Sequence, residues 1–251
     1  MEKQITKTFW ASALVLLMMI PGLTVAQVET SLNPGVDVMS RYIWRGINLG
    51  GSSPSIQPSL EFTAGNFTLG SWGAFSTSNG LGLQETDLYL SYTFRDVVSL
   101  TVTDFFFPND TVGNNHYFEF DENKTGHLME ASAMFNGTDK IPFTFMAALN
   151  FWGADALKAD GKKQYSTYFE LGYNGTCKEV DYNVFLGFTP NNPDEEKGET
   201  GYYGPDAGII NLGIKASKSL KINDNFSLPI STSLIVNPVA ENVFLVVGIS
   251  L

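Results

Sequence analysis

The residues that could do chemistry are carboxylates and a few basic side chains, set at every second position of extended segments. In residues 84–94, Glu85 and Asp87 alternate with Thr86, Leu88 and Leu90. Because successive side chains of a strand point to opposite faces, such a segment has one apolar face and one charged face. Rings of carboxylates attract cations. We predict that the charged faces line a pore, with Asp37, Arg41, Arg45, Glu61, Glu85, Asp87, Glu130, Glu170, Asp181 and Lys215 as pore-lining residues.

Signals for catalysis are weak. The chain has no glycine-rich phosphate loop, no His-Glu-x-x-His and no nucleophile elbow. His127 with Ser132 or Ser166 is the one nucleophile–base option, and nothing in the sequence indicates that they meet. His116 and His127, with acidic residues between them, are one candidate for a divalent metal site. The alternative is that these are simply the polar residues of a solvent-exposed loop. We therefore expect no enzyme, no catalytic or metal-binding residues and no cofactor.

Composition narrows the class of protein. The formal net charge of −11, with scattered Lys and Arg, gives no footprint for nucleic-acid binding. Cys177 is the only cysteine, so no intramolecular disulfide can form. Residues 27–251 contain no apolar stretch long enough for a membrane helix. An exported chain with 13% aromatic residues and 24 glycines is then either a soluble β-protein or an outer-membrane barrel.

The first 26 residues have the features of a secretory signal peptide. Lys3 and Lys7 precede a short apolar core, Pro21 and Gly22 break it, and Ala26 ends a small-residue cleavage site. We predict residues 1–26 as a signal peptide and residues 27–251 as one barrel in the bacterial outer membrane.

Period-two alternation predicts about twelve strands, the signature of a transmembrane β-barrel. The last segment shows it best, with Val243, Leu245, Val247, Ile249 and Leu251 on one face. Short and long connections alternate along the chain, as periplasmic turns and external loops do. The predicted strands are residues 35–45, 55–64, 67–77, 84–94, 97–107, 127–135, 141–151, 164–173, 180–188, 207–216, 225–236 and 241–251.

Aromatic residues gather near the ends of these segments. In transmembrane barrels such residues form girdles at the two membrane interfaces, although strands are rich in aromatic residues anyway. We predict membrane-interface aromatics at Tyr42, Trp44, Tyr92, Phe94, Phe151, Trp152, Tyr173 and Phe188.

The N-terminal segment resembles a known family. Residues 40–46, Ser-Arg-Tyr-Ile-Trp-Arg-Gly, are similar to the Ser-x-Tyr-x-aromatic-Arg-Gly signature that opens the TorF family of porin-like proteins. Residues 54–57, 70–73 and 168–173 resemble later blocks of that family. The resemblance implies an outer-membrane β-barrel of poorly defined function. The chain departs from it by ending in Leu251, where such barrels usually end in Phe.

The sequence thus predicts an all-β, single up-and-down antiparallel barrel for passive passage of small polar solutes, with a weak preference for cations. Its expected partners are outer-membrane lipid, the barrel assembly machinery and a small polar solute, with no nucleic acid. Two alternatives stay open: a soluble secreted β-sandwich that binds glycans or a partner protein, and a surface barrel enzyme acting on lipid or peptide. Heat-modifiable migration on unboiled gels separates barrel from sandwich, and hydrolysis assays on His127→Ala separate pore from enzyme.

Overall fold

The structure is a computed structural model that describes residues 28–78, 84–108 and 116–251. The predicted signal peptide, residues 1–26, lies outside the described residues, as do parts of the predicted loops 78–83 and 108–126. Within the described ranges, no helix is long and apolar enough to cross a membrane.

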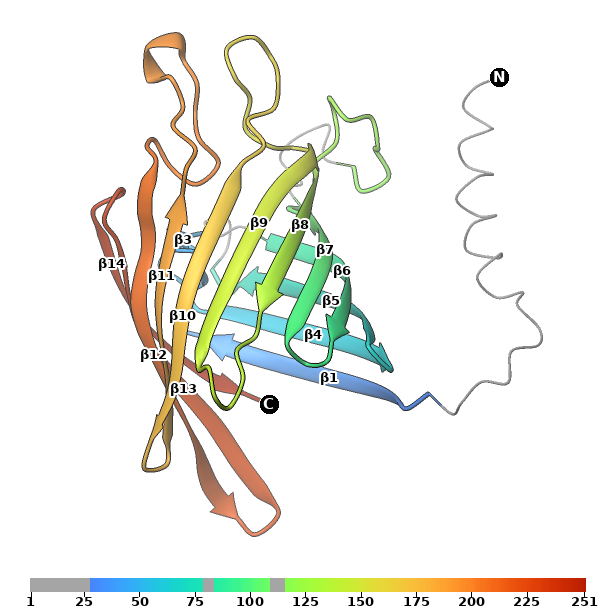
Figure 1. The fold of residues 1–251 in the computed structure, drawn as a ribbon, viewed down its shortest axis with the longest axis vertical. Helices are drawn as coiled ribbons and strands as arrows, with labels where there is room; N and C mark the ends of the chain where they lie inside the picture. Colours follow the sequence, from blue (N-terminus) through green and yellow to red (C-terminus); the bar gives the residue numbers. More distant parts are fainter. Residues whose placement is uncertain (1–27, 79–83, 109–115) are drawn as a thin grey trace, which may run out of the picture.

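Twelve antiparallel strands close into a single barrel, as predicted (Figure 1). Each strand pairs with its neighbours in the chain, and β1 closes the barrel by pairing with both β4 and β14. The barrel strands are β1 (Thr30–Met39), β4 (Ser55–Ala64), β5 (Phe67–Ser76), β6 (Gln84–Phe94), β7 (Val98–Phe106), β8 (His127–Phe135), β9 (Phe143–Gly153), β10 (Thr167–Cys177), β11 (Val180–Thr189), β12 (Gly208–Asn223), β13 (Phe226–Asn237) and β14 (Asn242–Ser250). A separate hairpin of β2 (Ile43–Trp44) and β3 (Ile47–Asn48) and a 3₁₀ turn, η1 (Glu195–Lys197), complete the described elements. This closed barrel excludes the β-sandwich alternative.

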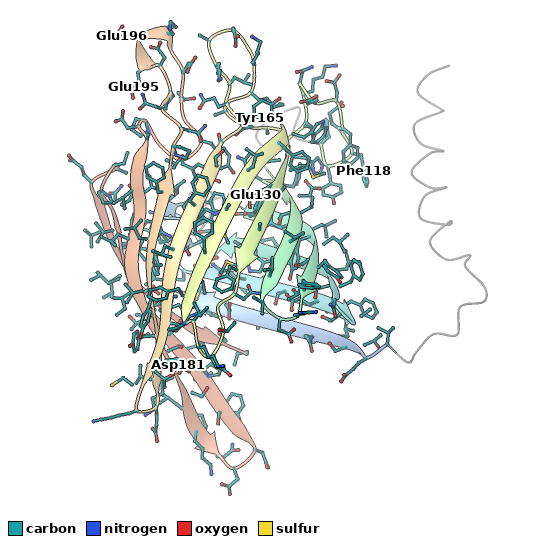
Figure 2. All side chains as sticks on the ribbon, in the orientation of Figure 1. Phe118, Glu130, Tyr165, Asp181, Glu195 and Glu196 are labelled. Atoms are coloured by element: carbon teal, nitrogen blue, oxygen red, sulfur yellow. The ribbon has the colours of Figure 1, made fainter. Side chains whose placement is uncertain are left out.

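The connections differ at the two ends of the barrel. Between β4 and β5, β6 and β7, and β10 and β11 they are only two or three residues long, with a positive φ at Gly65, Arg95, Asp96 and Lys178. Longer connections, such as those that follow β9 and β11, lie at the opposite end (Figure 1). We call these the turn end and the loop end. Figure 2 shows Glu195 and Glu196 at the tip of a loop-end connection and Asp181 near the turn end.

The outer face of the barrel is apolar and the inner face is polar. On β6, Leu88 and Leu90 are 44% and 52% exposed, whereas the alternating Glu85 and Asp87 are 1% and 5% exposed. On β14, Val243, Leu245 and Val247 point outward in the same way. Exposed apolar side chains on the outer face of a closed barrel form the band that faces lipid in membrane barrels.

The predicted first strand is wrong in its bounds. Residues 35–45 were expected to form one strand, but β1 covers Thr30–Met39 and the chain then leaves the barrel wall. Pro34 lies inside β1, opposite Leu60 of β4, although proline is rare within sheets. Residues 40–45 leave the wall because Tyr42 and Arg45 find partners inside the barrel, as described below.

A matched pair of substitutions tests which face meets lipid. Val102 on β7 points outward and is 47% exposed, while its neighbour Thr101 points inward, where it donates to Ser91. Val102→Arg should impair folding into lipid vesicles by about 2–4 kcal/mol, the cost of arginine near the bilayer midplane.

Thr101→Arg is the control, because its new charge would point into the polar lumen. The folded fraction of each variant can be read from heat-modifiable migration across a urea series. Equal folded fractions of Val102→Arg and Thr101→Arg would contradict the assignment of Val102 to the outer face and Thr101 to the inner face.

Candidate functional site

A short hairpin between β1 and β4 is the most distinctive feature inside the barrel. Its two strands pair Ile43 with Asn48 and Trp44 with Ile47. Arg45 and Gly46 form its tip, both with positive φ, of 49° and 78°. Two central residues with positive φ are typical of a two-residue hairpin turn. Glycine at the second position adopts this backbone conformation without steric strain, because it has no Cβ atom. We call residues 42–48 the lumen hairpin.

The lumen hairpin lies inside the barrel because it contacts opposite parts of the wall. The Tyr42 hydroxyl donates to Glu85 of β6 over 2.7 Å, and the Arg45 guanidinium binds Glu130 of β8. On the other side, Asn237 of β13 donates to the Gly46 carbonyl. A segment that touches strands so far apart in a closed barrel must cross its lumen.

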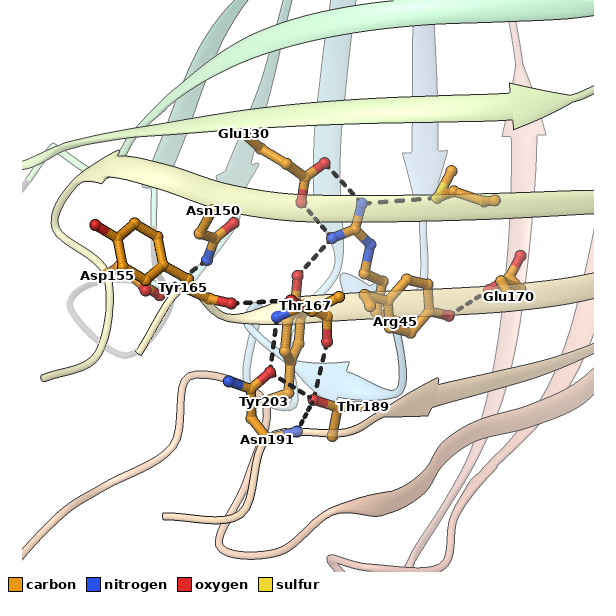
Figure 3. Close-up of polar contacts among 12 residues, drawn as sticks. Arg45, Glu130, Asn150, Asp155, Tyr165, Thr167, Glu170, Thr189, Asn191 and Tyr203 are labelled. Carbon is orange, nitrogen blue, oxygen red and sulfur yellow. Dashed lines mark hydrogen bonds and ion pairs between the residues drawn. The ribbon is translucent and has the colours of Figure 1, made fainter. Parts of the chain in front are cut away.

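Arg45 is the anchor of this hairpin (Figure 3). Its Nη1 and Nη2 atoms donate to the two Glu130 oxygens over 2.5 and 2.9 Å, and Nη1 also donates to the Tyr203 hydroxyl over 2.7 Å. The guanidinium carbon lies 4.5 Å from the ring centre of Trp44 and 4.6 Å from that of Tyr168. Only 10% of the Arg45 side chain and 3% of the Glu130 side chain are exposed. A bidentate arginine–carboxylate pair between aromatic faces satisfies a charge that burial would otherwise penalise heavily.

The loop between β11 and β12 completes the cage around Arg45. Tyr203 stacks on Trp44 with ring centres 5.8 Å apart and packs with Tyr168 and Ile210 in a buried cluster. Burial raises the pKa of the Tyr203 phenol above its usual range, which keeps it neutral as the acceptor for Arg45. The loop end of the lumen is therefore packed like a protein core.

A second polar network lies on the inner face beside this cage. Tyr168 donates to Glu170 through its hydroxyl, and Asn211 of β12 donates to the same carboxylate over 2.9 Å and to the Tyr168 hydroxyl over 3.0 Å. These bonds satisfy Glu170 without a cation. They also hold the Tyr168 ring against the Arg45 guanidinium.

The turn end of the lumen is open. A cavity of about 940 Å³ lies there, lined by turn residues and by inner-face side chains of β11 and β12. Its charged lining residues are Arg95, Asp96, Asp139, Asp181 and Lys215. The lumen thus has a packed half at the loop end and a polar vestibule at the turn end.

Comparisons with known proteins place the chain in a family. A family model described as "Bacterial protein of unknown function (Gcw_chp)" matches residues 25–184. The chain belongs to this family. No curated protein matches it. A solved structure titled "KdgM porin" is similar with a TM-score of 0.45 and 11% sequence identity, over 86% of this chain and 97% of that chain. That likeness is too distant to carry an argument, so the barrel rests on the strand pairing.

The family model covers the segment that suggested the TorF resemblance, but the TorF family itself stays a prediction. The resembling block, residues 40–46, contains the first half and the tip of the lumen hairpin. Tyr42, Arg45 and Gly46 of this block each contact the barrel wall, through Glu85, Glu130 and Asn237 respectively. The spacing of these three residues is therefore the spacing that lets the hairpin reach all three wall residues.

Several sequence predictions about this segment are wrong. Arg41 and Arg45 are not on a barrel strand, and Arg45 lies at the tip of the lumen hairpin, where it pairs with Glu130. Tyr42 and Trp44 do not belong to a membrane-interface girdle, because Tyr42 is 5% exposed and Trp44 packs on Tyr203 in the lumen. Arg41, just before the hairpin, makes no hydrogen bond or ion pair among the described side chains.

The other predicted site residues lie on barrel strands or next to them. Glu85, Asp87, Glu130 and Glu170 come together around the hairpin, whereas Asp181 and Lys215 line the turn-end vestibule. Asp37 pairs in register with Gln57, and Glu61 accepts from the Tyr89 hydroxyl. The remaining predicted girdle residues are on the outer faces or strand ends, and their contact with a membrane interface stays a prediction: Tyr92, Phe94, Phe151, Trp152, Tyr173 and Phe188.

His127 is on the outer wall. Its Nδ1 lies 2.8 Å from Asp104 and its Nε2 lies 2.6 Å from the Tyr117 carbonyl, beneath the rings of Tyr117 and Phe120. Ser132 shares the inner face with Glu130, so strand alternation separates it from His127. In the described ranges, no group of three or more His, Cys, Asp or Glu could hold a metal ion.

Gly46 offers a test of how tightly the hairpin fits. A Cβ atom at this position would lie 1.8 Å from the Ile210 carbonyl oxygen, a backbone atom of β12 that cannot move away. Gly46→Ala should therefore displace the hairpin tip while the barrel still forms. We expect slow proteolysis of residues 42–48 in the folded wild-type barrel and cleavage at least tenfold faster in the variant.

Gly161→Ala is the control, because Gly161 has a similar φ of 79° but no atom within 4 Å of its Cβ position. It should leave the cleavage rate of the hairpin unchanged. Equal protection of the hairpin in Gly46→Ala and wild type would show that the tip does not press against β12.

Proposed function

We propose that the protein is an outer-membrane, porin-like barrel that passes small polar solutes passively, with a weak preference for cations, and that the lumen hairpin restricts this passage. The observation that carries the proposal is a barrel with an apolar outer face whose polar lumen is open at one end and filled by a hairpin at the other. A barrel that served only as a membrane anchor would need no vestibule.

The membrane location is supported by the outer face. Side chains such as Leu69, Leu100 and Leu245 are more than half exposed on neighbouring parts of the wall. A soluble protein would expose such a continuous apolar surface at a high risk of aggregation. In a bilayer the same surface is stabilised, and closure of the sheet leaves no unpaired strand edge in lipid.

The cation preference is supported by the charges on the inner face. Most of the predicted pore-lining residues are acidic, and Arg45 is already neutralised by Glu130. Low-dielectric walls focus the field of the remaining carboxylates on the narrow lumen. The preference should be modest and should weaken at high salt, where the screening length falls to about 3 Å at 1 M.

Planar-bilayer recording tests this function. A variant with residues 42–48 replaced by a glycine–serine linker should conduct several-fold more than wild type, because the packed half of the lumen loses its contents. Reversal potentials across a salt gradient should show cation preference in both proteins.

The matched control replaces the loop tip Glu195–Lys197, which lies outside the lumen, by glycine and serine (Figure 2). Its conductance should equal that of wild type. A folded linker variant that does not conduct, or that prefers anions at low salt, would contradict the proposed function.

A further inference from the structure

Two carboxyl groups on β6 are buried without a cation from the chain. Glu85 and Asp87 share the inner face, two residues apart, and are 1% and 5% exposed. The two carboxyl groups lie within hydrogen-bonding reach of each other. Burial of two neighbouring carboxylates is costly unless a positive charge or a proton compensates for it.

The described protein groups satisfy this pair only in part. The Tyr42 hydroxyl donates to Glu85 Oε2 over 2.7 Å. Asp87 accepts a hydrogen bond from the Phe106 backbone, but its Oδ1 is buried and has no hydrogen-bond partner within the described ranges. Among the ion pairs of the described residues, none involves Glu85 or Asp87, and the nearby Arg45 is bound to Glu130.

Aromatic rings surround the pair. Trp72 of β5 and Phe105 of β7 are the direct cross-strand neighbours of Asp87. The Tyr42 ring lies 5.4 Å from Trp72, and the Trp44 ring lies 5.6 Å from Phe105. Aromatic faces attract cations through their quadrupole, most strongly where water is excluded.

The groups around Arg45 show that a carboxylate and aromatic rings together bind a cation in the same lumen. There a carboxylate and the rings of Trp44, Tyr168 and Tyr203 enclose a guanidinium of the chain itself. The Glu85–Asp87 site also combines carboxylates with aromatic rings beside the hairpin, but no basic side chain among the described residues pairs with it.

We propose that Glu85, Asp87 and the Tyr42 hydroxyl bind one small monovalent cation, of the size of potassium or ammonium. A divalent ion is disfavoured, because calcium takes six to eight oxygen ligands and magnesium a strict octahedron. A weakly hydrated monovalent ion loses less hydration free energy than a divalent ion when it leaves water, and it gains from the aromatic surroundings. The site goes beyond the proposed passage of solutes, since binding can be measured whether or not the barrel conducts.

The test is the melting temperature of the refolded barrel, followed by heat-modifiable migration, in potassium chloride and in N-methylglucamine chloride at equal ionic strength. A ligand that binds the folded state stabilises it in proportion to its saturation. We expect wild type to melt several degrees higher in potassium chloride, with a saturable dependence on its concentration. Asp87→Asn and Glu85→Gln should abolish the difference between the salts.

Glu61→Gln is the matched control, because Glu61 is also an inner-face carboxylate but accepts from Tyr89, and no hydrogen bond or ion pair of the described residues joins it to Glu85, Asp87 or Tyr42. It should keep the potassium effect. Crystals grown with rubidium in place of potassium should show an anomalous peak between Glu85 and Asp87 in wild type and in Glu61→Gln, but not in Asp87→Asn.

Three results would overturn the proposal. They are equal melting temperatures in the two salts, a potassium effect that survives in Asp87→Asn, and a dependence of wild-type melting on pH alone, which would mean that a proton neutralises the pair. A saturable potassium effect in a barrel that never conducts would instead contradict the proposed function and support the cation site.

Discussion

The ion pair between Arg45 and Glu130 is the interaction on which the inside of the barrel depends. A guanidinium withdrawn from water must recover its solvation from fixed groups, and here these are two carboxylate oxygens, a tyrosine hydroxyl and two aromatic faces. Glu130 comes from the wall, Trp44 from the hairpin and Tyr203 from a loop-end connection. One charge therefore holds together three parts of the chain that are distant in sequence.

This arrangement divides the lumen into a packed part and an open part. Around Arg45, the rings of Tyr168 and Tyr203 and the Ile210 side chain pack as a core. Toward the turn end, polar and charged side chains line the open vestibule. A solute that enters the vestibule would meet the hairpin before the loop end, so any passage through the barrel depends on how the hairpin is held. The acidic pair at Glu85 and Asp87 lies on the wall beside that same hairpin, where Tyr42 links the two.

The barrel could be predicted from the sequence, and most of its lumen could not. The alternation of charged and apolar residues, as in Glu85, Asp87, Leu88 and Leu90, is a local property of a strand. It can therefore be recognised in the sequence without knowledge of the rest of the fold. The position of Arg45 depends instead on Glu130, Tyr168 and Tyr203, which are 85 or more residues away. The apolar residues around Arg45 also continue the alternation of the first strand, which hid the hairpin. The signal that could have revealed it is the Arg45–Gly46 dipeptide between Trp44 and Ile47, because glycine at the second position favours a two-residue turn.

A double-mutant cycle on Arg45 and Glu130 tests most directly whether this pair anchors the hairpin inside the barrel. The free energy of unfolding in urea would be measured for wild type, Arg45→Met, Glu130→Gln and the double variant. For a buried pair, each single change should cost about 3–5 kcal/mol, because it leaves one charge buried without its partner. The double variant should cost less than the sum of the two by about 1.5–3 kcal/mol. A coupling of only about 0–1 kcal/mol, as for an exposed salt bridge, would contradict the buried anchor.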